Sequence, residues 1–174
     1  MTENAIITVS YIASAVSPKV LQNPALTIGM GAFTDLRGLD PRLVMDKIRL
    51  GGGPPRGSYL TEEPVAGLLA RAVAEVLGQA GYKVKEKDAD YTLTGKLANL
   101  KFHVTMGFAR ALLRGEITVD FSVLKNADIS PAASFSVTGH GRTGSGDVVA
   151  DVFKSAVEDL ARQLAAHPLL AGLF

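Results

Sequence analysis

Two segments with apolar residues at helical spacing constrain the fold of this chain most. Residues 61–81 and 147–167 each carry a single apolar stripe. A single stripe is typical of a helix that buries one face against another layer. Segments typical of β-strands lie at 5–12, 25–33, 82–86, 90–104, 112–125 and 134–141. This order predicts an α+β fold, with two amphipathic helices packed on one face of a mostly antiparallel or mixed β-sheet.

Short signals predict where these elements begin, end and change register. Thr61 is the expected N-cap of the first helix, with Glu62 and Glu63 in its first turn and Gly81 just beyond its end. The apolar alternation of 90–104 shifts by one residue after Asn99, which predicts a β-bulge there. The segment 112–125 is expected to form a hairpin with 90–104.

The length and composition predict a single domain over residues 1–174. The chain has 174 residues, of which 47% are hydrophobic and 20% charged, which suffices for a sizeable core. Residues 34–60 read as a long irregular loop region with one short strand near 43–50. The Gly- and Pro-rich stretch 51–57 disfavours regular structure there.

Composition argues against several classes of function. The net charge of +1 and the lack of Trp give no sign of a nucleic-acid partner. The chain has no Cys, and its three His residues lack the close spacing of paired metal ligands. Carboxylate pairs fall in expected first helical turns, where the helix dipole accounts for them. We therefore expect no metal, no cofactor and no catalytic residues, in a protein that is not an enzyme.

The segment GHGRTG, residues 139–144, literally matches the G-x-G-x-x-G pattern of dinucleotide sites. It follows an expected strand and precedes an expected helix. However, the chain ends with that helix, so no second parallel strand completes the unit. A small-ligand or nucleotide-binding protein that uses the Gly139–Gly146 loop is thus the alternative functional hypothesis. The simpler interpretation is a glycine-rich connection between strand and helix.

The stretch GAFTDLRGLDP, residues 31–41, has a polar segment directly after an apolar strand. Asp35 and Arg37 are two residues apart, which is typical of an Asx-type turn with a surface ion pair. The alternative is that both side chains and the loop 38–57 form a partner-binding rim. Arg56 in that loop either binds an anionic group or simply faces water. Double substitution of Asp35 and Arg37 by Ala distinguishes the two interpretations, because only a structural role shifts the melting temperature strongly.

The expected hairpin end, residues 103–113, is unusually apolar for a connection between strands. Met106, Phe108 and Leu112 lie in it, with Arg110 as the single charge near the tip. Either the tip folds onto the core, or it forms an exposed apolar patch for a partner or a membrane surface. Self-association through an exposed strand edge such as 112–125 is a further hypothesis.

Three stretches together resemble the YajG-like bacterial lipoproteins and related envelope auxiliary lipoproteins. They are ALTIGMGAFTDLRG, then YLTEEPVAGLLARAVAEVLGQAGYKV, then ADYTLTGKLANL. The shared pattern is a strand ending in F-x-D-x-R, a Gly-rich loop, an amphipathic helix with a G-Y-x-V exit, and an A-D-Y-x-L-x-G strand. The likeness extends from about Ile6 to Leu164.

The resemblance implies a function as well as a fold. It implies a non-enzymatic domain at the periplasmic face of the cell envelope, anchored in the outer membrane by an N-terminal lipid. The signal peptide and lipid-bearing cysteine of the family are not in this sequence, so the resemblance implies that the chain is the processed or engineered soluble part. Its expected partners are envelope proteins, in an assembly or accessory role, with a homo-oligomer as a further option.

Overall fold

The computed structural model describes residues 3–9, 17, 21–47, 53, 54, 56–106, 111–142 and 148–174, with the backbone alone at 106, 111 and 148. In chain order the elements are β1 Ala5–Ile7, β2 Thr27–Asp35, β3 Leu43–Asp46, β4 Ser58–Thr61, α1 Val65–Gln79, β5 Lys83–Lys85, β6 Tyr91–Met106, β7 Ala111–Lys125, β8 Ser130–Arg142, α2 Val148–Ala165 and α3 Pro168–Ala171. The predicted order of strands and long helices is confirmed.

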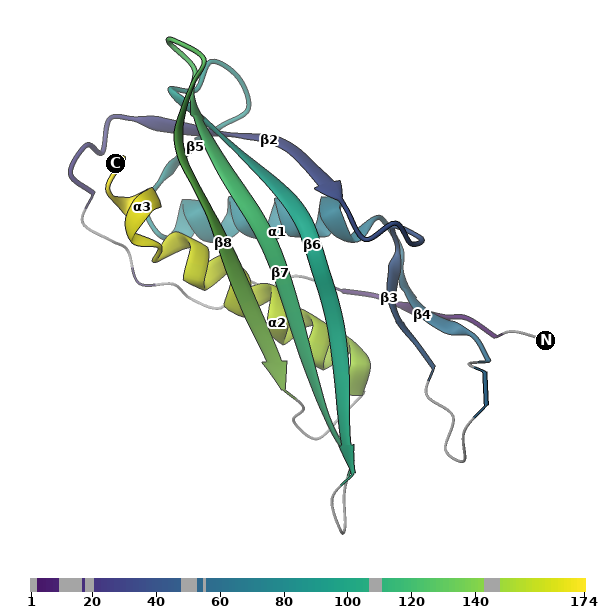
Figure 1. The fold of residues 1–174 in the computed structure, drawn as a ribbon. Coiled ribbons are helices and arrows are strands. Elements are labelled where there is room, and N and C mark those ends of the chain that lie inside the picture. The colour runs from purple at the N-terminus through teal and green to yellow at the C-terminus, as the bar shows by residue number, and fades with distance from the viewer. Residues whose placement is uncertain are drawn as a thin grey trace.

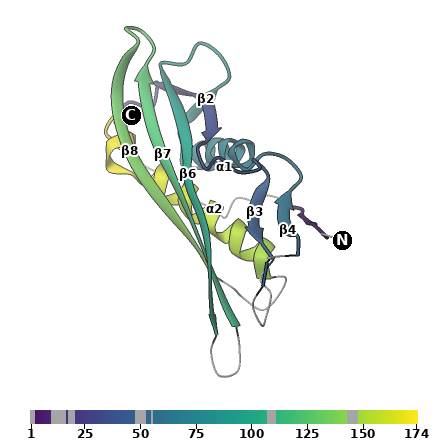
Figure 2. The same cartoon turned by 45° about the vertical axis from the view of Figure 1, so that its right-hand side comes forward.

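A five-stranded mixed sheet forms the main layer, in the order β5-β2-β6-β7-β8. β2 runs parallel to both β5 and β6, whereas β6, β7 and β8 form an antiparallel meander. Helices α1 and α2 lie on the same side of this sheet, as Figures 1 and 2 show. The α+β fold with helices on one face is therefore confirmed.

The core lies between this sheet and the two long helices. Residues of β7 at alternate positions point into it, and Ile117, Val119, Phe121 and Val123 are at most 1% exposed. The apolar stripes of the two helices face these residues, with Leu69 and Val73 in α1 and Phe153 and Leu160 in α2. The period-2 and period-3.6 patterns thus meet in one apolar layer, which is why they coexist in the sequence.

The register of β6 changes where the sequence predicts it. Leu97 pairs with Val119, but Asn99 pairs with Thr118, so one residue of β6 is left unpaired. This bulge keeps the apolar residues on the helix-covered face on both sides of the shift. The predicted hairpin between β6 and β7 is confirmed by continuous antiparallel pairing as far as Met106 and Ala111.

Two expectations about helix ends are wrong and one is confirmed. Thr61 is not the N-cap of α1, because it is the last residue of β4 and its hydroxyl donates to the carbonyl of Glu63. Consequently Glu62 and Glu63 precede the helix, which begins at Val65. At the other end Gly81 has φ of 99°, and the N–H of Tyr82 reaches the carbonyl of Leu77 over 3.0 Å, the pattern of a Schellman motif.

The second long helix ends slightly before His167, where the apolar stripe of 147–167 predicts its end. α2 ends at Ala165, before Pro168, which instead begins the short helix α3. Proline suits that position because its missing N–H has no partner in a first helical turn. Asp151 lies in the first turn of α2 as expected, and Asp147 lies outside the described residues.

The region 34–60 contains more regular structure than expected. β3 and β4 pair antiparallel, and β4 pairs in parallel with β1, giving a three-stranded sheet in the order β1-β4-β3. The short segment Ser58–Thr61 follows a Gly- and Pro-rich stretch and carries no strong strand signal of its own. Its pairing partners are distant in sequence, so tertiary contacts decide its conformation.

The segment 112–125 is not an exposed edge, and the hypothesis of self-association through it is wrong. β7 lies between β6 and β8 and pairs with both along its length. The outer strand on this side is β8, and α2 covers part of its edge: Asp159 accepts the backbone N–H of His140 at 2.9 Å, and Gln163 donates to the carbonyl of Thr138 at 3.0 Å. Side chains of α2 thus hydrogen-bond to backbone groups on the edge of β8 that could otherwise pair with another strand.

Candidate functional site

The corner that follows β2, residues 35–42, is the best-defined candidate site. Arg37 forms a bidentate ion pair with Asp35: Nε donates to Oδ1 at 2.9 Å and Nη2 donates to Oδ2 at 2.6 Å. The backbone N–H of Arg37 also donates to Asp35 Oδ1 at 3.0 Å, which is the predicted Asx-type turn. The ion pair is not at the surface as expected, since the side chains of Arg37 and Asp35 are 6% and 11% exposed.

The arrangement favours the charged form of Asp35. Burial raises the pKa of this carboxyl, but the hydrogen bonds from the Arg37 side chain and backbone and the charge of Arg37 outweigh it, so the pKa is lowered from 3.8. The remaining terminal nitrogen of the guanidinium, Nη1, donates to the carbonyl of Leu43 at 2.7 Å. Each charged group in the corner is therefore supplied with partners.

The corner connects three parts of the molecule. The N–H of Leu36 donates to the carbonyl of Leu97 in β6 at 3.0 Å. The N–H of Thr61 in β4 donates to the carbonyl of Arg42 at 2.9 Å, and the N–H of Val65 in α1 donates to the carbonyl of Pro41 at 2.8 Å. The corner therefore joins the large sheet, the small sheet and the start of α1, and it holds a fixed shape.

The corner exposes two large apolar side chains beside the exposed Asp40–Arg42 ion pair. Leu36 and Leu39 are each 58% exposed, on either side of the buried Arg37. Sequence reasoning named Asp35 and Arg37 and missed these leucines. The available signal was the alternation in D-L-R: when the ion pair turns inward, the residue between its members turns outward.

The remaining residues predicted for partner binding lie elsewhere. Arg56 is exposed and precedes Gly57, at the end of the β3–β4 ladder away from the corner. Leu112 is 46% exposed and lies at the start of β7, beside the β6–β7 connection. Phe108 and the side chain of Met106 lie outside the described residues. The structure thus keeps Asp35 and Arg37 together and separates them from Arg56 and Leu112.

The glycines of the G-x-G-x-x-G match do not form a ligand loop in the part that the structure describes. Gly139 and Gly141 lie within β8, and their Cα atoms face α2. A methyl group on Gly139 overlaps the carbonyl oxygen of Ala156, and one on Gly141 overlaps that of Val152. These two glycines therefore let α2 approach the sheet closely. Gly144 lies outside the described residues.

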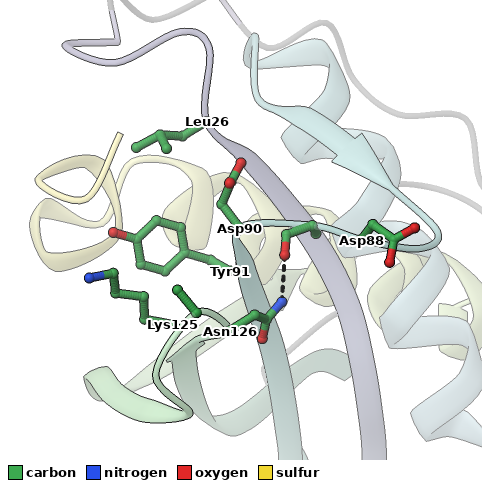
Figure 3. Close-up of a pocket in the computed structure, with 8 residues that line it drawn as sticks. Leu26, Asp88, Asp90, Tyr91, Lys125 and Asn126 are labelled. Atoms are coloured by element: carbon green, nitrogen blue, oxygen red, sulfur yellow. Dashed lines mark hydrogen bonds between the residues drawn. The ribbon is translucent and has the colours of Figure 1, made fainter.

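A pocket of about 550 Å³ lies at the end of the sheet where β6 begins and β7 ends, as Figure 3 shows. Its polar groups serve the local structure. Asp90 accepts the N–H and the hydroxyl of Thr27 at 2.8 and 2.7 Å, and Asn126 donates to the carbonyl of Ala89 at 2.7 Å (Figure 3). Lys125 lies 3.7 Å from Asp128. Asp90 and Lys125 thus have local partners, and Asp88 points away from both in Figure 3, so the charged groups do not converge on one point as catalytic groups do.

Among the residues that the structure describes, no group of three or more His, Asp or Glu side chains is placed to hold a metal ion. No helix formed by those residues has both the length and the apolar character that crossing a bilayer requires.

Comparisons with known proteins identify the fold. The sequence matches no protein-family model and no curated protein. A Xanthomonas campestris protein described under the family model DUF330 is similar in structure, with a TM-score of 0.68 and 19% identity over 97% of both chains. At this identity the likeness shows a shared fold.

Two further solved structures are more weakly similar. A minor lipoprotein from Acinetobacter baumannii has a TM-score of 0.46 and 7% identity, over 83% of this chain and 92% of that chain. PelC from Paraburkholderia phytofirmans, described as a dodecamer, has a TM-score of 0.45 and 13% identity, over 89% of this chain and 93% of that chain.

Proposed function

We propose that this chain is the globular part of a non-enzymatic cell-envelope lipoprotein, which docks another envelope protein through the corner after β2. The YajG-like motifs in the sequence support the lipoprotein assignment. The DUF330 protein shares the fold described above. The expected location is the periplasmic face of the envelope, with an N-terminal lipid holding the protein at the outer membrane.

One observation carries the docking role: a buried ion pair holds a short corner that exposes two leucines. Burying Arg37 and Asp35 costs desolvation energy, and an exposed turn needs no such pair. The pair fixes Leu36 and Leu39 before any partner arrives. A rigid apolar surface loses little conformational entropy on binding, so its buried area contributes more to affinity.

Site-specific photo-crosslinking in the native cells tests this role. A photoreactive residue is placed at position 36 or 39 of the natural gene product, and adducts are identified by mass spectrometry. We expect one discrete envelope-protein adduct from both positions. An adduct with the mass of two copies of this chain shows instead that the corner is a homo-oligomer interface, and it contradicts docking of a different protein.

Ile129 provides the matched control, because it is apolar, 83% exposed and located at the β7–β8 turn. A photoreactive residue at position 129 should give no discrete adduct. Equal adducts from positions 36 and 129, or none from 36 and 39, contradict the docking role. Either result leaves the lipoprotein assignment to a separate test.

That test uses the natural gene product with its own N-terminus. Cells are labelled with an alkyne fatty acid and fractionated, and the protein is followed through both steps. We expect a labelled protein in the envelope fraction. An unlabelled protein in the soluble cytoplasmic fraction contradicts the assignment.

A further inference from the structure

The open face of the five-stranded sheet, which α1 and α2 leave uncovered, carries an ordered pattern of charges. Its side chains form rows across β6, β7 and β8, fixed by the register of the strands. One row consists of Lys101, Glu116 and His140, and another of Lys96, Asp120 and Ser136. In both rows a carboxylate on the central strand faces a lysine on β6, so that opposite charges are neighbours.

The last row before the hairpin end breaks this pattern. His103 pairs with Arg114, and Arg114 pairs with Arg142, so a basic residue replaces the central carboxylate. All three side chains are exposed. Like charges directly opposite each other destabilise a sheet. Within the described part of the chain, neither arginine has a carboxylate within salt-bridge distance.

A pocket of about 290 Å³ opens on this row. Both arginines, His103 and His140 line it, together with Glu116, which has Lys101 directly opposite on the adjacent strand. Directly opposite residues on neighbouring strands have Cβ atoms about 5 Å apart. Two guanidinium groups at that spacing reach one small anion together, and the imidazoles add N–H donors at either side.

We infer that this pocket binds a phosphate group, with Arg114 and Arg142 as its main ligands and His103 and His140 as flanking donors. A phosphate suits the site because its oxygens accept hydrogen bonds from several directions, whereas a carboxylate has only two oxygens. The phosphate is either that of a soluble ester or that of a lipid headgroup. The pocket is remote from the corner after β2, since His103 lies six residues beyond Leu97 along β6, so the inference does not depend on the docking role.

Calorimetric titration with inorganic phosphate and pyrophosphate, at constant ionic strength, tests the soluble source. Sedimentation with phosphatidylcholine vesicles, with and without phosphatidylglycerol, tests the headgroup. The decisive variant is Arg114→Gln with Arg142→Gln. The matched control is Lys83→Gln with Lys96→Gln, which removes the same charge from exposed positions of the same sheet and leaves Lys101, the neighbour of Glu116, in place.

The wild type should bind at least one of the two phosphate sources. The arginine variant should lose at least about tenfold in affinity, since charge-assisted hydrogen bonds are the strong ones. The lysine variant should stay within about twofold of the wild type, because its residues do not line the pocket. Failure of the wild type to bind either source overturns the inference. Equal losses in both variants also overturn it, because they indicate general charge attraction.

Discussion

Arg37 and Arg114 place the same side chain in opposite surroundings. Arg37 is buried after β2, and its guanidinium binds Asp35 and the carbonyl of Leu43. Arg114 is exposed on β7, with basic residues directly opposite on both neighbouring strands. The first arrangement is complete within the protein, whereas the second acquires a partner only from outside. A structural arginine is thus distinguished from a ligand-binding one by whether the protein itself supplies the counter-charge.

The largest effect expected from this comparison is the removal of Asp35. Asp35→Ala leaves the Arg37 guanidinium buried without its counter-charge, and should lower the free energy of unfolding by about 3 kcal/mol or more. Denaturant unfolding measures it. Asp40→Ala is the control, because the Asp40–Arg42 pair is exposed, and it should cost only about 1 kcal/mol, from the hydrogen bond that Asp40 accepts from the backbone of Arg42. Equal effects of the two substitutions refute the structural role of the corner pair.

The next largest effect is expected on the covered face of the sheet, where α2 packs closely on β8. Gly141→Ala places a methyl group against the backbone of Val152 in α2, and should cost about 1–3 kcal/mol by overpacking. Gly78→Ala in the last turn of α1 meets no atom within 4 Å, and should stabilise by about 0.5–1 kcal/mol. Both values come from thermal or denaturant unfolding. If Gly141→Ala is neutral, α2 does not pack on β8 as closely as described.

The dependence of stability on pH provides a further test, through Asp35 in the corner and Asp159 in α2. Burial raises the pKa of Asp35 and of Asp159, but the hydrogen bonds they accept and their neighbouring arginines outweigh it, so both pKa values lie below 3.8. A lowered folded pKa gives stability that is fully present above the unfolded value and lost as pH falls through the folded one. Stability should therefore fall below about pH 4, and Asp35→Asn should flatten this dependence in acid unfolding curves. An unchanged dependence indicates that Asp35 gains no partner on folding.

The smallest expected change in stability concerns the basic row, which consists of His103, Arg114 and Arg142. Without any phosphate present, Arg114→Gln should raise the free energy of unfolding by about 0.2–1 kcal/mol, because it removes a charge that faces the like charge of Arg142. Lys101→Gln, which instead removes the partner of Glu116, should lower it slightly. The difference should shrink at high salt, as expected for exposed charges. The opposite order of the two variants contradicts the charge pattern of the open face.

Much of the fold is predictable from the sequence because periodicity alone determines it. The alternation in 112–125 and the stripes of both helices specify which faces are buried. The shift of phase after Asn99 even locates the bulge. Thr61 was misassigned because a threonine before a helix is equally suited to end a strand, and β4 has no strong signal of its own. That choice is made by partners in β1 and β3.

The candidate sites are less predictable, for two reasons. The Asx-type turn at Asp35 and Arg37 is a local pattern, but its burial depends on β3, β4 and α1 closing over it. The basic row requires the register of β7 with β8, which shifts between Val123 and Leu124 near a turn containing Ile129 at φ of 51°. A slip of one residue there moves Arg142 to the other face. Nothing in the sequence alone aligns Arg114 with Arg142.

The most direct test of the account measures both properties in both arginine sites. Unfolding free energy and phosphate affinity are determined side by side for Arg37→Gln and for Arg114→Gln with Arg142→Gln. We expect Arg37→Gln to lose about 3 kcal/mol of stability, from an unpaired buried carboxylate, while its folded fraction still binds phosphate. The double variant should keep or gain stability and lose phosphate binding. A stable Arg37→Gln protein, or a double variant that unfolds, contradicts the division between a structural and a ligand-binding arginine site.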